Sequence, residues 1–156
     1  MLKPAILFKD ELERKFKEQI YTNDFFLYAG YDGCAYIPEI KMEDFSYQYA
    51  IVDGDNVIGY FSYSLNTCSD TINNFGLYSF DRGNAIIGKD LLRKMKELIK
   101  AHHRIEWRMI GGNPIKRHYD RFCKRCGGNI VKLHEVVRTP SGDYADEYIY
   151  EIVNSD

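Results

Sequence analysis

The sequence has few of the features that would place it in a specialised protein class. Only four of its 156 residues are cysteine and four are proline, and a chain of this length buries about two thirds of its unfolded surface without disulfide or metal staples. No apolar run approaches the roughly 20 residues that span a bilayer, and no secretory signal is visible. No repeat, low-complexity tract or Pro/Gly/Ser-rich linker divides the sequence. We therefore expect one domain over residues 1–156, no membrane contact and a cytoplasmic location.

Only one pair of cysteines has the spacing of a metal or redox site. Cys123 and Cys126 are separated by two residues, but a zinc site needs two further ligands. The remaining cysteines and histidines show no second pair of this kind. We expect ordinary free thiols and no metal, and zinc or redox chemistry at this pair is kept as an alternative.

The net charge is only −2, but the charges are unevenly distributed. Residues 82–126 carry 13 Lys/Arg and 4 Asp/Glu, whereas residues 1–81 carry 6 and 13, and residues 127–156 carry 2 and 6. A basic central third suits a polyanionic ligand. Solvated helix faces would give the same composition. A nucleic acid could also use such a surface, but the basic residues lack the interleaved aromatics of stacking platforms, so nucleic acid is the less favoured partner.

The first part of the chain predicts a strand and then helices. Pro4–Phe8 is short and apolar enough for an edge strand, and Lys9–Ile20 has a helical apolar period with Asp10 as its cap. Phe25–Tyr31 predicts a second short helix, and Asp32–Asp44 reads as a loop.

The middle of the chain predicts three strands. Tyr47–Val52 and Val57–Leu65 form a hairpin around a turn, with Val57 and Phe61 expected on one face. Thr71–Phe80 is a third, less regular strand, as expected where a strand bulges or bends. The residues that interrupt its apolar pattern are Asn73, Asn74 and Gly76.

The last part of the chain contains the clearest helix. Apolar residues from Ile87 to Ile99 recur on one helical face, opposite lysines and arginines. A strand over Ile105–Ile110 follows, then a helix capped by Asn113 with Pro114 at its first position, and finally a hairpin of Ile130–Val137 with Tyr144–Val153. The complete order contains seven strands and four helices and predicts an α/β arrangement with a β-α-β crossover at its centre.

The turn before the central helix is the most informative segment. It runs from Asp81 to Gly88 and opens directly into the helix. The first N–H groups of a helix have no intrahelical acceptor, and the helix dipole places roughly half a positive charge there. The segment therefore predicts an anion site, with a diphosphate-bearing cofactor as the first candidate.

The element order and this turn resemble the GNAT superfamily of acyl-CoA-dependent N-acetyltransferases. The likeness covers most of the chain and is strongest from Tyr49 to Phe122. That family carries the signature R/Q-x-x-G-x-G/A between its fourth strand and third helix, where backbone amides hold the CoA pyrophosphate. Here Arg82 to Gly88 follows the signature imperfectly, as a loop one residue longer would. The resemblance implies an α/β (α+β) fold with a mixed, mostly antiparallel sheet of about seven strands and about four helices.

The resemblance also implies where the cofactor binds. In the family, the strands on either side of this helix diverge and the pantetheine arm lies between them. An Asn after the fifth strand and a Tyr on the next helix, here Asn113 and Tyr119, complete the pattern, although another register would put Phe122 in place of the tyrosine. The implied cofactor-binding residues are Tyr78, Ser79, Phe80, Arg82, Gly83, Asn84, Ala85, Ile86, Ile87, Gly88 and Asn113.

The chemistry of acyl transfer suggests roles for two residues. The departing thiolate benefits from a proton donor, and Tyr119 is the candidate acid unless its ring only packs the helix face. Glu106 is the candidate base, with a surface carboxylate paired to Arg108 as the more ordinary interpretation. Cys123 is a poorer candidate nucleophile, because no His and Asp arrangement is recognisable near it. The resemblance implies direct attack without a covalent enzyme intermediate.

The expected partners are a CoA thioester, acetyl-CoA as co-substrate, and an amine acceptor. The acceptor is expected to be a primary amine of a small molecule or peptide, and a homodimer is possible. The first helices, the following loop and the terminal hairpin should build the acceptor side. Candidate residues there are Tyr28, Tyr31, Tyr36, Glu39, Glu43 and Asp44. A CoA-binding or interaction module without turnover is the alternative, since the turn is imperfect and Tyr119 is displaced by one residue.

Overall fold

The computed structural model describes residues 1–22 and 37–154. The helix predicted over Phe25–Tyr31 and the first part of the predicted loop lie outside the described residues. The described elements are β1 (Leu2–Pro4), the 3-10 helix η1 (Ala5–Phe8), α1 (Lys9–Gln19), β2 (Ser46–Asp53), β3 (Asn56–Asn66), β4 (Thr71–Ser79), α3 (Ala85–Ala101), β5 (Arg104–Ile110), α4 (Lys116–Arg125), β6 (Asn129–Arg138) and β7 (Tyr144–Val153).

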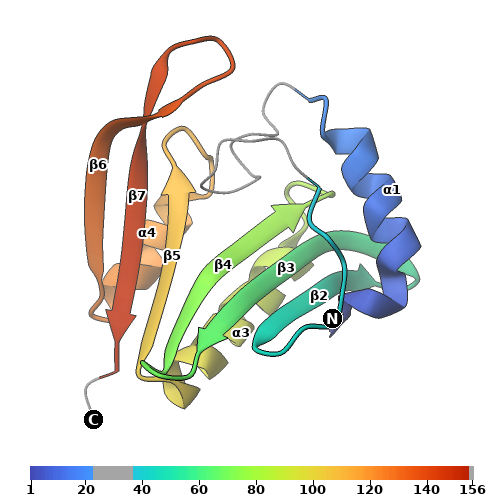
Figure 1. Ribbon diagram of the computed structural model, residues 1–156, viewed down its shortest axis with the longest axis horizontal. Coiled ribbons are helices and arrows are strands. Elements are labelled where there is room, and N and C mark those ends of the chain that lie inside the picture. Colours follow the sequence, from blue (N-terminus) through green and yellow to red (C-terminus); the bar gives the residue numbers. More distant parts are fainter. Residues whose placement is uncertain (23–36, 155–156) are drawn as a thin grey trace.

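The seven described strands form one sheet in the order β1-β2-β3-β4-β5-β7-β6 (Figure 1). Within the described part of the chain, β4 and β5 are parallel and the other five neighbouring pairs are antiparallel. Helix α3 makes the crossover between the two parallel strands. The predicted mixed, mostly antiparallel sheet with a central β-α-β crossover is confirmed. Three α-helices and η1 are described, where about four helices were predicted.

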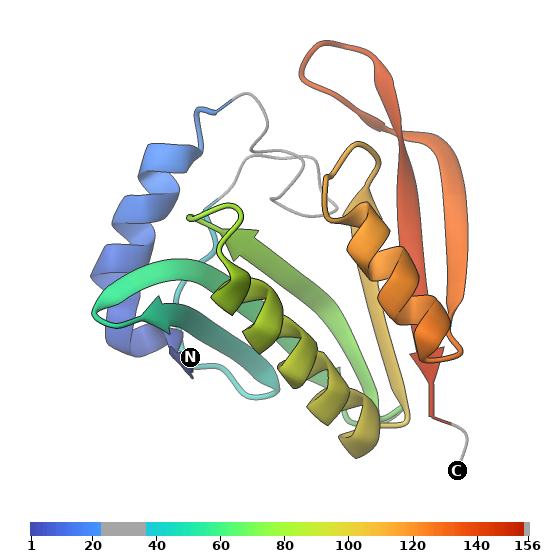
Figure 2. The same ribbon diagram turned by 180° about the vertical axis from the view of Figure 1, so that it is seen from behind.

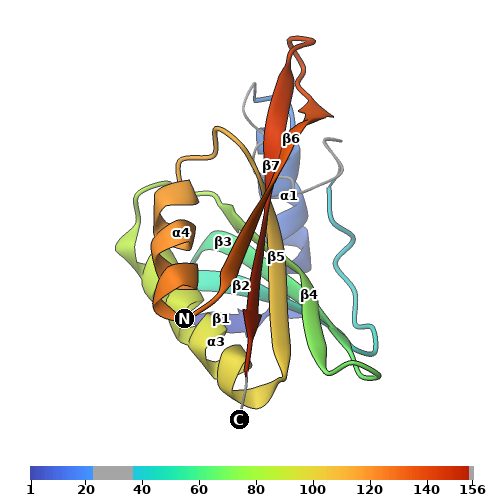
Figure 3. The ribbon, with the colours of Figure 1, turned by 90° about the vertical axis from the view of Figure 1, so that its left-hand side faces the viewer.

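The sheet separates two apolar cores. Helices α3 and α4 cover one face (Figure 2), where α3 buries Ile87, Leu91 and Met95 against the strands. Helix α1 covers the other face, where Leu12 and Phe16 lie in a second core. The view along the sheet shows α3 and α4 on one side (Figure 3). These two sides are the α3/α4 face and the α1 face. None of the described helices is both long enough and apolar enough to cross a bilayer.

The start of the chain differs from the prediction of a strand over Pro4–Phe8. Strand β1 ends at Pro4, and the four residues after it form η1. A short run of consecutive apolar residues has no period that distinguishes a strand from a helical turn. Asp10 does not cap α1, because η1 runs directly into the helix and Phe8 occupies the N-cap position without a side-chain bond.

The predicted face of Val57 is also wrong. Ile51 pairs with Gly59 and Val52 pairs with Val57, so Ile58 is an extra residue in β3. One inserted residue reverses which face the following side chains occupy. Val57 therefore packs in the core under α1, whereas Phe61 packs in the core under α3.

Helix α4 begins at Lys116 rather than at Pro114. Asn113 closes a turn before the helix: its side-chain oxygen accepts a hydrogen bond from the N–H of Ile115 at 3.1 Å, and its carbonyl accepts one from the N–H of Lys116 at 3.1 Å. The asparagine thus holds the connection between β5 and α4 instead of capping the helix directly.

Candidate functional site

The parallel pair β4 and β5 is joined at one end only. The described pairs are Thr71 with Arg104, Ile72 with Ile105, and Phe75 with Trp107. After the third pair the strands diverge, which is visible where their upper ends separate in Figure 1. We call the region between Leu77–Ser79 of β4 and Arg108–Ile110 of β5 the strand opening.

A bulge in β4 accounts for the divergence. Between Ile72 and Phe75 the strand has three residue steps, while β5 has two between Ile105 and Trp107, and the ladder with β3 shifts at the same place. Asn74 in this bulge has a φ of 50°, a left-handed conformation that asparagine tolerates better than most residues. A bulge increases local twist and bends the strand. The interruption of the apolar pattern at Asn73, Asn74 and Gly76 predicted this feature, and the structure confirms it.

Main-chain groups of β4 face the strand opening in alternation. The N–H of Phe80 donates to the carbonyl of Ile58 in β3, so the main chain of Phe80 and, two residues earlier, of Tyr78 is directed at β3. Leu77 and Ser79 alternate with these two residues along the strand, so their N–H and C=O groups are directed away from β3, toward β5. Of the three residues expected to pair with pantetheine, Ser79 alone has the required main-chain direction.

The same alternation assigns one residue of β5. The N–H of Gly111 donates to the carbonyl of Asp146 at 2.7 Å, which directs its main chain toward β7. The main chain of Ile110 is therefore directed toward β4, across the strand opening. The sequence interpretation did not include Leu77 and Ile110 among the residues that border the opening. The period of two in a strand shows that main-chain directions alternate, but it does not show which residues face which neighbouring strand.

The turn that follows β4 leads to the N-terminus of α3. The side chain of Asn84 accepts a hydrogen bond from the N–H of Ile86 at 3.0 Å and donates one to the Asp81 carboxylate at 2.8 Å. The N–H groups of Gly83 and Ala85 have no acceptor among the described residues. They are free donors at the positive end of a 17-residue helix, which is the arrangement that binds anions.

The side chains of this turn divide into two groups. Ile87 is buried beneath α3, and Ile86 packs against the same core. Arg82, Gly83 and Gly88 are exposed. A side chain built at Gly83 or Gly88 meets no atom within 4 Å, and Gly83 has a φ of 90°. Both glycines therefore leave room for a ligand to approach the backbone closely.

Three buried polar side chains around the strand opening have no hydrogen-bond partner among the described residues. They are the Ser79 hydroxyl, the Trp107 indole N–H and the Glu147 carboxylate. Ser79 and Trp107 lie on the α3/α4 face, because Tyr78, the neighbour of Ser79, belongs to the opposite core and Trp107 packs under α4. Glu147 is paired with Ile110 and lies on the α1 face. Buried polar groups without a protein partner are costly, and a bound water, an ion or a functional role accounts for such groups in folded proteins.

Tyr119 on α4 is buried against the ring of Trp107. Its ring lies edge-on to Trp107 at 5.7 Å and to Tyr150 at 5.9 Å. Burial raises the pKa of Tyr119, so its hydroxyl is protonated at neutral pH. Phe122, the alternative in the other register, also packs on Trp107, with the ring centroids 6.5 Å apart.

Glu106 lies beside the paired part of β4 and β5. Its position in β5 is between Ile105 and Trp107, the second and third residues to pair with β4. Its carboxylate forms an ion pair with Arg104 at 2.8 Å. Arg104 thus pairs with Glu106, and Glu106 is on the same face of the sheet as Glu147.

Cys123 and those residues of the expected acceptor side that the structure describes are not among the residues that border the strand opening. Cys123 is buried, donates to the carbonyl of Asn129 at 3.3 Å, and has a pKa raised by burial, which disfavours the nucleophilic thiolate.

Of the candidates for the acceptor side, Glu39 and Glu43 form ion pairs with Lys41 at 3.0 and 3.5 Å. Asp44 is exposed. The aromatic candidates Tyr28, Tyr31 and Tyr36 lie outside the described residues.

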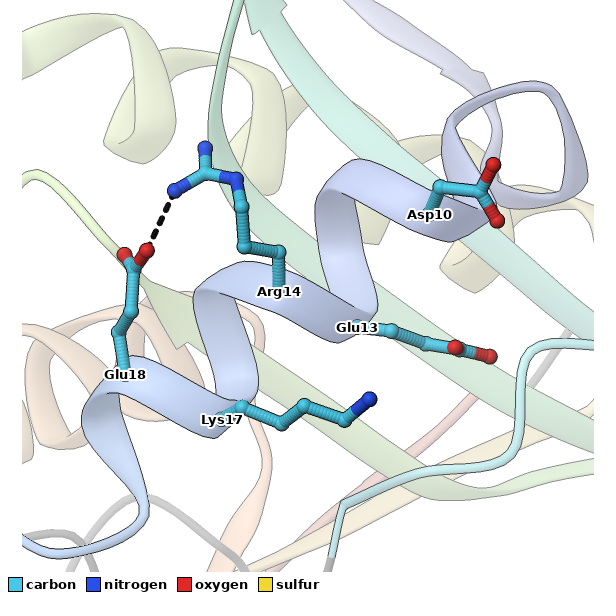
Figure 4. Close-up of a pocket in the computed structure, with 5 residues that line it drawn as sticks. All are labelled: Asp10, Glu13, Arg14, Lys17 and Glu18. Carbon is cyan, nitrogen blue, oxygen red and sulfur yellow. Dashed lines mark hydrogen bonds and ion pairs between the residues drawn. The ribbon is translucent and has the colours of Figure 1, made fainter.

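A hollow on the surface runs along α1. Its lining residues are Asp10, Glu13, Arg14, Lys17 and Glu18 (Figure 4). Arg14 and Glu18 form an ion pair one turn apart. None of these side chains belongs to β4, β5 or α3, and charged residues three and four apart are usual on a solvated helix face. The hollow is therefore not part of the site around the strand opening.

Comparisons with solved structures show the same fold in acetyltransferases. The ribosomal L7/L12 alpha-N-protein acetyltransferase RimL, in complex with CoA, matches with a TM-score of 0.71 and 13% identity over 97% of this chain and 92% of that one. The N-acetyltransferase from Staphylococcus aureus Mu50 matches with a TM-score of 0.71 and 14% identity over 98% and 97%. The microcin C7 self-immunity acetyltransferase MccE, in complex with acetyl-CoA and AMP, matches with a TM-score of 0.69 and 16% identity over 98% of this chain and 91% of that one.

These likenesses show that the chain has the fold of the GNAT acetyltransferases. No protein-family model and no curated protein sequence matches the chain.

Proposed function

We propose that this protein is an N-acetyltransferase that transfers an acetyl group from acetyl-CoA to a primary amine of a small molecule or peptide. The observation that carries the proposal is the strand opening, where β4 and β5 stop pairing after Phe75 and Trp107. An open strand end beside a helix N-terminus is a place for an extended, amide-containing arm that ends in a diphosphate. Complexes of similar structures with CoA and with acetyl-CoA support the choice of cofactor.

The residues of the chain fit acetyl-CoA along its length. The diphosphate would bind the N–H groups of Gly83 and Ala85 at the positive end of α3. The pantetheine amides would pair with the main chain of Ser79 and Leu77 on one side and Ile110 on the other. Lysines and arginines on α3 and α4, within the basic block of residues 82–126, favour the approach of this polyanion.

The geometry supports direct attack of the amine on the thioester. A main-chain N–H that faces the strand opening is suited to stabilise the oxyanion of the tetrahedral intermediate, and removal of such a donor typically costs about 100- to 1000-fold in kcat. Tyr119 would protonate the leaving thiolate as the attacking nitrogen gives up a proton, and burial raises the pKa of Tyr119, so the hydroxyl carries its proton at neutral pH.

A second candidate function is an acyl-CoA-binding module without turnover. The observation that favours it is the position of Tyr119, whose ring packs among Trp107 and Tyr150 in the core as a purely structural aromatic residue would. The strand opening and the anion site would be the same in both proteins. The two candidates differ only in the chemical step.

Calorimetric titration with acetyl-CoA and a thiol-release assay on a panel of primary amines test the proposal. We expect saturable binding with a Kd in the micromolar range and amine-dependent release of free thiol. Binding without thiol release on any amine would favour the binding module. The absence of binding would contradict both candidates.

A further inference from the structure

Glu147 is the most unusual carboxylate in the described structure. It lies in the middle of β7, paired with Ile110 of β5 and Leu133 of β6. Its side chain is only 1% exposed. Ile110 is a residue of β5 whose main chain is directed across the strand opening toward β4. The carboxylate is thus carried one strand away from the place where the thioester would lie.

The hydrogen bonding of Glu147 is incomplete. Neither carboxylate oxygen has a close hydrogen-bond donor among the described residues. The cation that pairs with it is Arg108, whose Nη1 lies 3.5 Å from Oε1. A buried carboxylate normally has several close donors, because burial without them destabilises the folded protein.

Glu151 provides the contrast within the same strand. It lies on the same face of β7, but its carboxylate accepts hydrogen bonds from Arg104 at 2.6 and 3.0 Å and from Asn129 at 3.3 Å. Those partners lower the pKa of Glu151, whereas burial raises the pKa of Glu147 against the opposing effect of Arg108. The fold surrounds the carboxylate of Glu151 with close donors and leaves that of Glu147 with one ion pair at 3.5 Å.

The unsatisfied groups differ between the two faces of the sheet. Ser79 and Trp107 offer hydrogen-bond donors on the α3/α4 face, which suit the carbonyl and phosphate oxygens of a thioester cofactor. Glu147 offers a carboxylate on the α1 face, which suits a cation with N–H donors. Apart from Arg108, the neighbours that face Glu147 across the two strand pairs, Ile110 and Leu133, are apolar.

We propose that Glu147 binds the ammonium form of the acceptor amine on the α1 face and accepts its proton, an inference that rests on the proposed acetyltransferase function. The ammonium transfers one proton to the Glu147 carboxylate, and the freed lone pair attacks the thioester carbonyl. The C–N bond forms and the C–S bond breaks. The thiolate takes a proton from Tyr119, which regains one from the acylated nitrogen. The proton on Glu147 passes to solvent, so that one proton is released for each amide and CoA formed.

The assignment predicts selectivity for amines over alcohols. An ammonium supplies several N–H donors and a second positive charge to a carboxylate whose one cationic neighbour, Arg108, lies 3.5 Å away, whereas an alcohol supplies one neutral donor. Glu106, the base expected from the sequence, has Arg104 as a close partner and lies beside the paired part of the strands. Glu147 is better placed and less satisfied.

The test compares Glu147→Gln with Glu151→Gln as the matched control in the same strand. We expect Glu147→Gln to lower kcat/KM for a primary amine about 100-fold or more at neutral pH. It should also remove the acidic limb of the profile of kcat/KM against pH, while acetyl-CoA binds as in the wild type. Glu151→Gln should keep the acidic limb. An unchanged rate and acidic limb in Glu147→Gln would overturn the inference.

A binding measurement separates this inference from the proposed function. With CoA present, which cannot transfer an acyl group, spermidine or a tripeptide with a free amino terminus should raise the Tm of the wild type but not of Glu147→Gln. Equal stabilisation of both proteins, or of neither, would contradict the role of Glu147. A wild type that binds no acetyl-CoA would instead contradict the proposed function.

Discussion

The two ends of the β4 and β5 strand pair are built from similar residues, but the main chains of the two strands pair with each other at one end only. At the lower end, Thr71, Ile72 and Phe75 pair with β5 and form part of the sheet. At the upper end, Leu77 and Ser79 of β4 and Ile110 of β5 have no such pairing. A single bulge around Asn74 separates the two ends. The comparison shows how one inserted residue ends the pairing of two strands and leaves main-chain groups of both strands facing an opening.

The upper end also carries buried polar groups that have no close hydrogen-bond partner among the described residues. Donors lie on the α3/α4 face, and a carboxylate lies on the α1 face. The lower end has its charged side chains paired, as Arg104 is with Glu106 and Glu151. The difference predicts that substitutions at the upper end change ligand binding and turnover, and that those at the lower end change stability.

The largest effect is expected when the upper end of β4 loses a main-chain donor. Ser79→Pro removes the N–H that faces the strand opening without removing a hydrogen bond to β3, since that N–H is directed away from β3. We expect turnover to fall about 100-fold, because the lost N–H would pair with the pantetheine and a misplaced thioester reacts more slowly by about this factor. Thiol release is the measurement, and circular dichroism checks the fold.

Ser79→Ala is the matched control for this variant. It removes the hydroxyl but keeps the N–H, so we expect a change of only a few-fold. Equal losses in Ser79→Pro and Ser79→Ala would mean that the main chain of β4 plays no part in turnover.

The next largest effect is expected when Tyr119, the candidate acid on the α3/α4 face, loses its hydroxyl. Tyr119→Phe keeps the ring that packs on Trp107 and removes only the hydroxyl. We expect kcat to fall about 100-fold, with little change in the affinity for acetyl-CoA. Steady-state kinetics measure the first quantity and calorimetry the second. An unchanged kcat would remove Tyr119 as the acid and leave it as a packing residue.

A smaller effect is expected at the first turn of α3. Gly88→Trp fills space that is open beside the turn and should weaken CoA binding about tenfold, close to 1.4 kcal/mol. Gly88→Ala should raise the free energy of unfolding by about 0.5–1 kcal/mol, because glycine is unfavourable inside a helix.

Leu92→Trp, one helical turn further along α3, is the control. Leu92 is 40% exposed and lies beyond the first turn. A CoA affinity that is the same in Gly88→Trp as in the wild type would mean that the phosphates do not approach this turn.

Asp81→Asn should strengthen CoA binding by two- to fivefold. The carboxylate accepts a hydrogen bond from Asn84 beside the helix N-terminus, where its charge repels a phosphate. A charge at this position typically contributes about 0.3–1 kcal/mol at low ionic strength. Calorimetry at two salt concentrations measures the gain, which should shrink as salt increases. Weaker binding in Asp81→Asn would argue that the diphosphate lies elsewhere.

The two glutamates of β7 should have opposite effects on stability. The pKa of Glu147 is raised in the folded protein from its ordinary value of 4.5, so its charge costs stability at neutral pH and costs nothing below pH 4. Glu147→Gln should therefore raise Tm at pH 7 and not at pH 4. The pKa of Glu151 is lowered, so its charge stabilises above that ordinary value and Glu151→Gln should lower Tm at pH 7.

Thermal unfolding of both variants and the wild type at the two pH values measures these shifts. Equal changes in Tm at pH 7 and pH 4 for Glu147→Gln would show that its charge does not oppose folding.

Much of the fold could be predicted from the sequence where the apolar period is regular. Helix α3 and the hairpin of β2 and β3 have unambiguous periods, and both are confirmed. The face of Val57 could not be predicted, because an inserted residue in β3 reverses the alternation and leaves no mark in the composition. The first turn at Ala5–Phe8 has no period long enough to identify.

Less of the candidate site could be predicted. The glycine turn and the broken pattern of β4 pointed to an anion site beside a bent strand. Whether Tyr78 or Ser79 directs its main chain toward β5 depends on the register with β3, which only the structure supplies. Glu147 gave no signal, since a glutamate in an alternating strand is usually exposed. Its burial and its missing hydrogen bonds arise from three strands that are distant in sequence.

Amide resonances of an isotope-labelled protein, followed by NMR as CoA is added, test the account most directly. We predict that the largest shifts occur at the N–H groups of Leu77, Ser79, Gly83, Ala85 and Ile110, with little change at Ile72 and Ile105 in the paired ends of the strands. Shifts confined to the α1 hollow, or equal shifts at both ends of β4 and β5, would contradict a cofactor held in the strand opening.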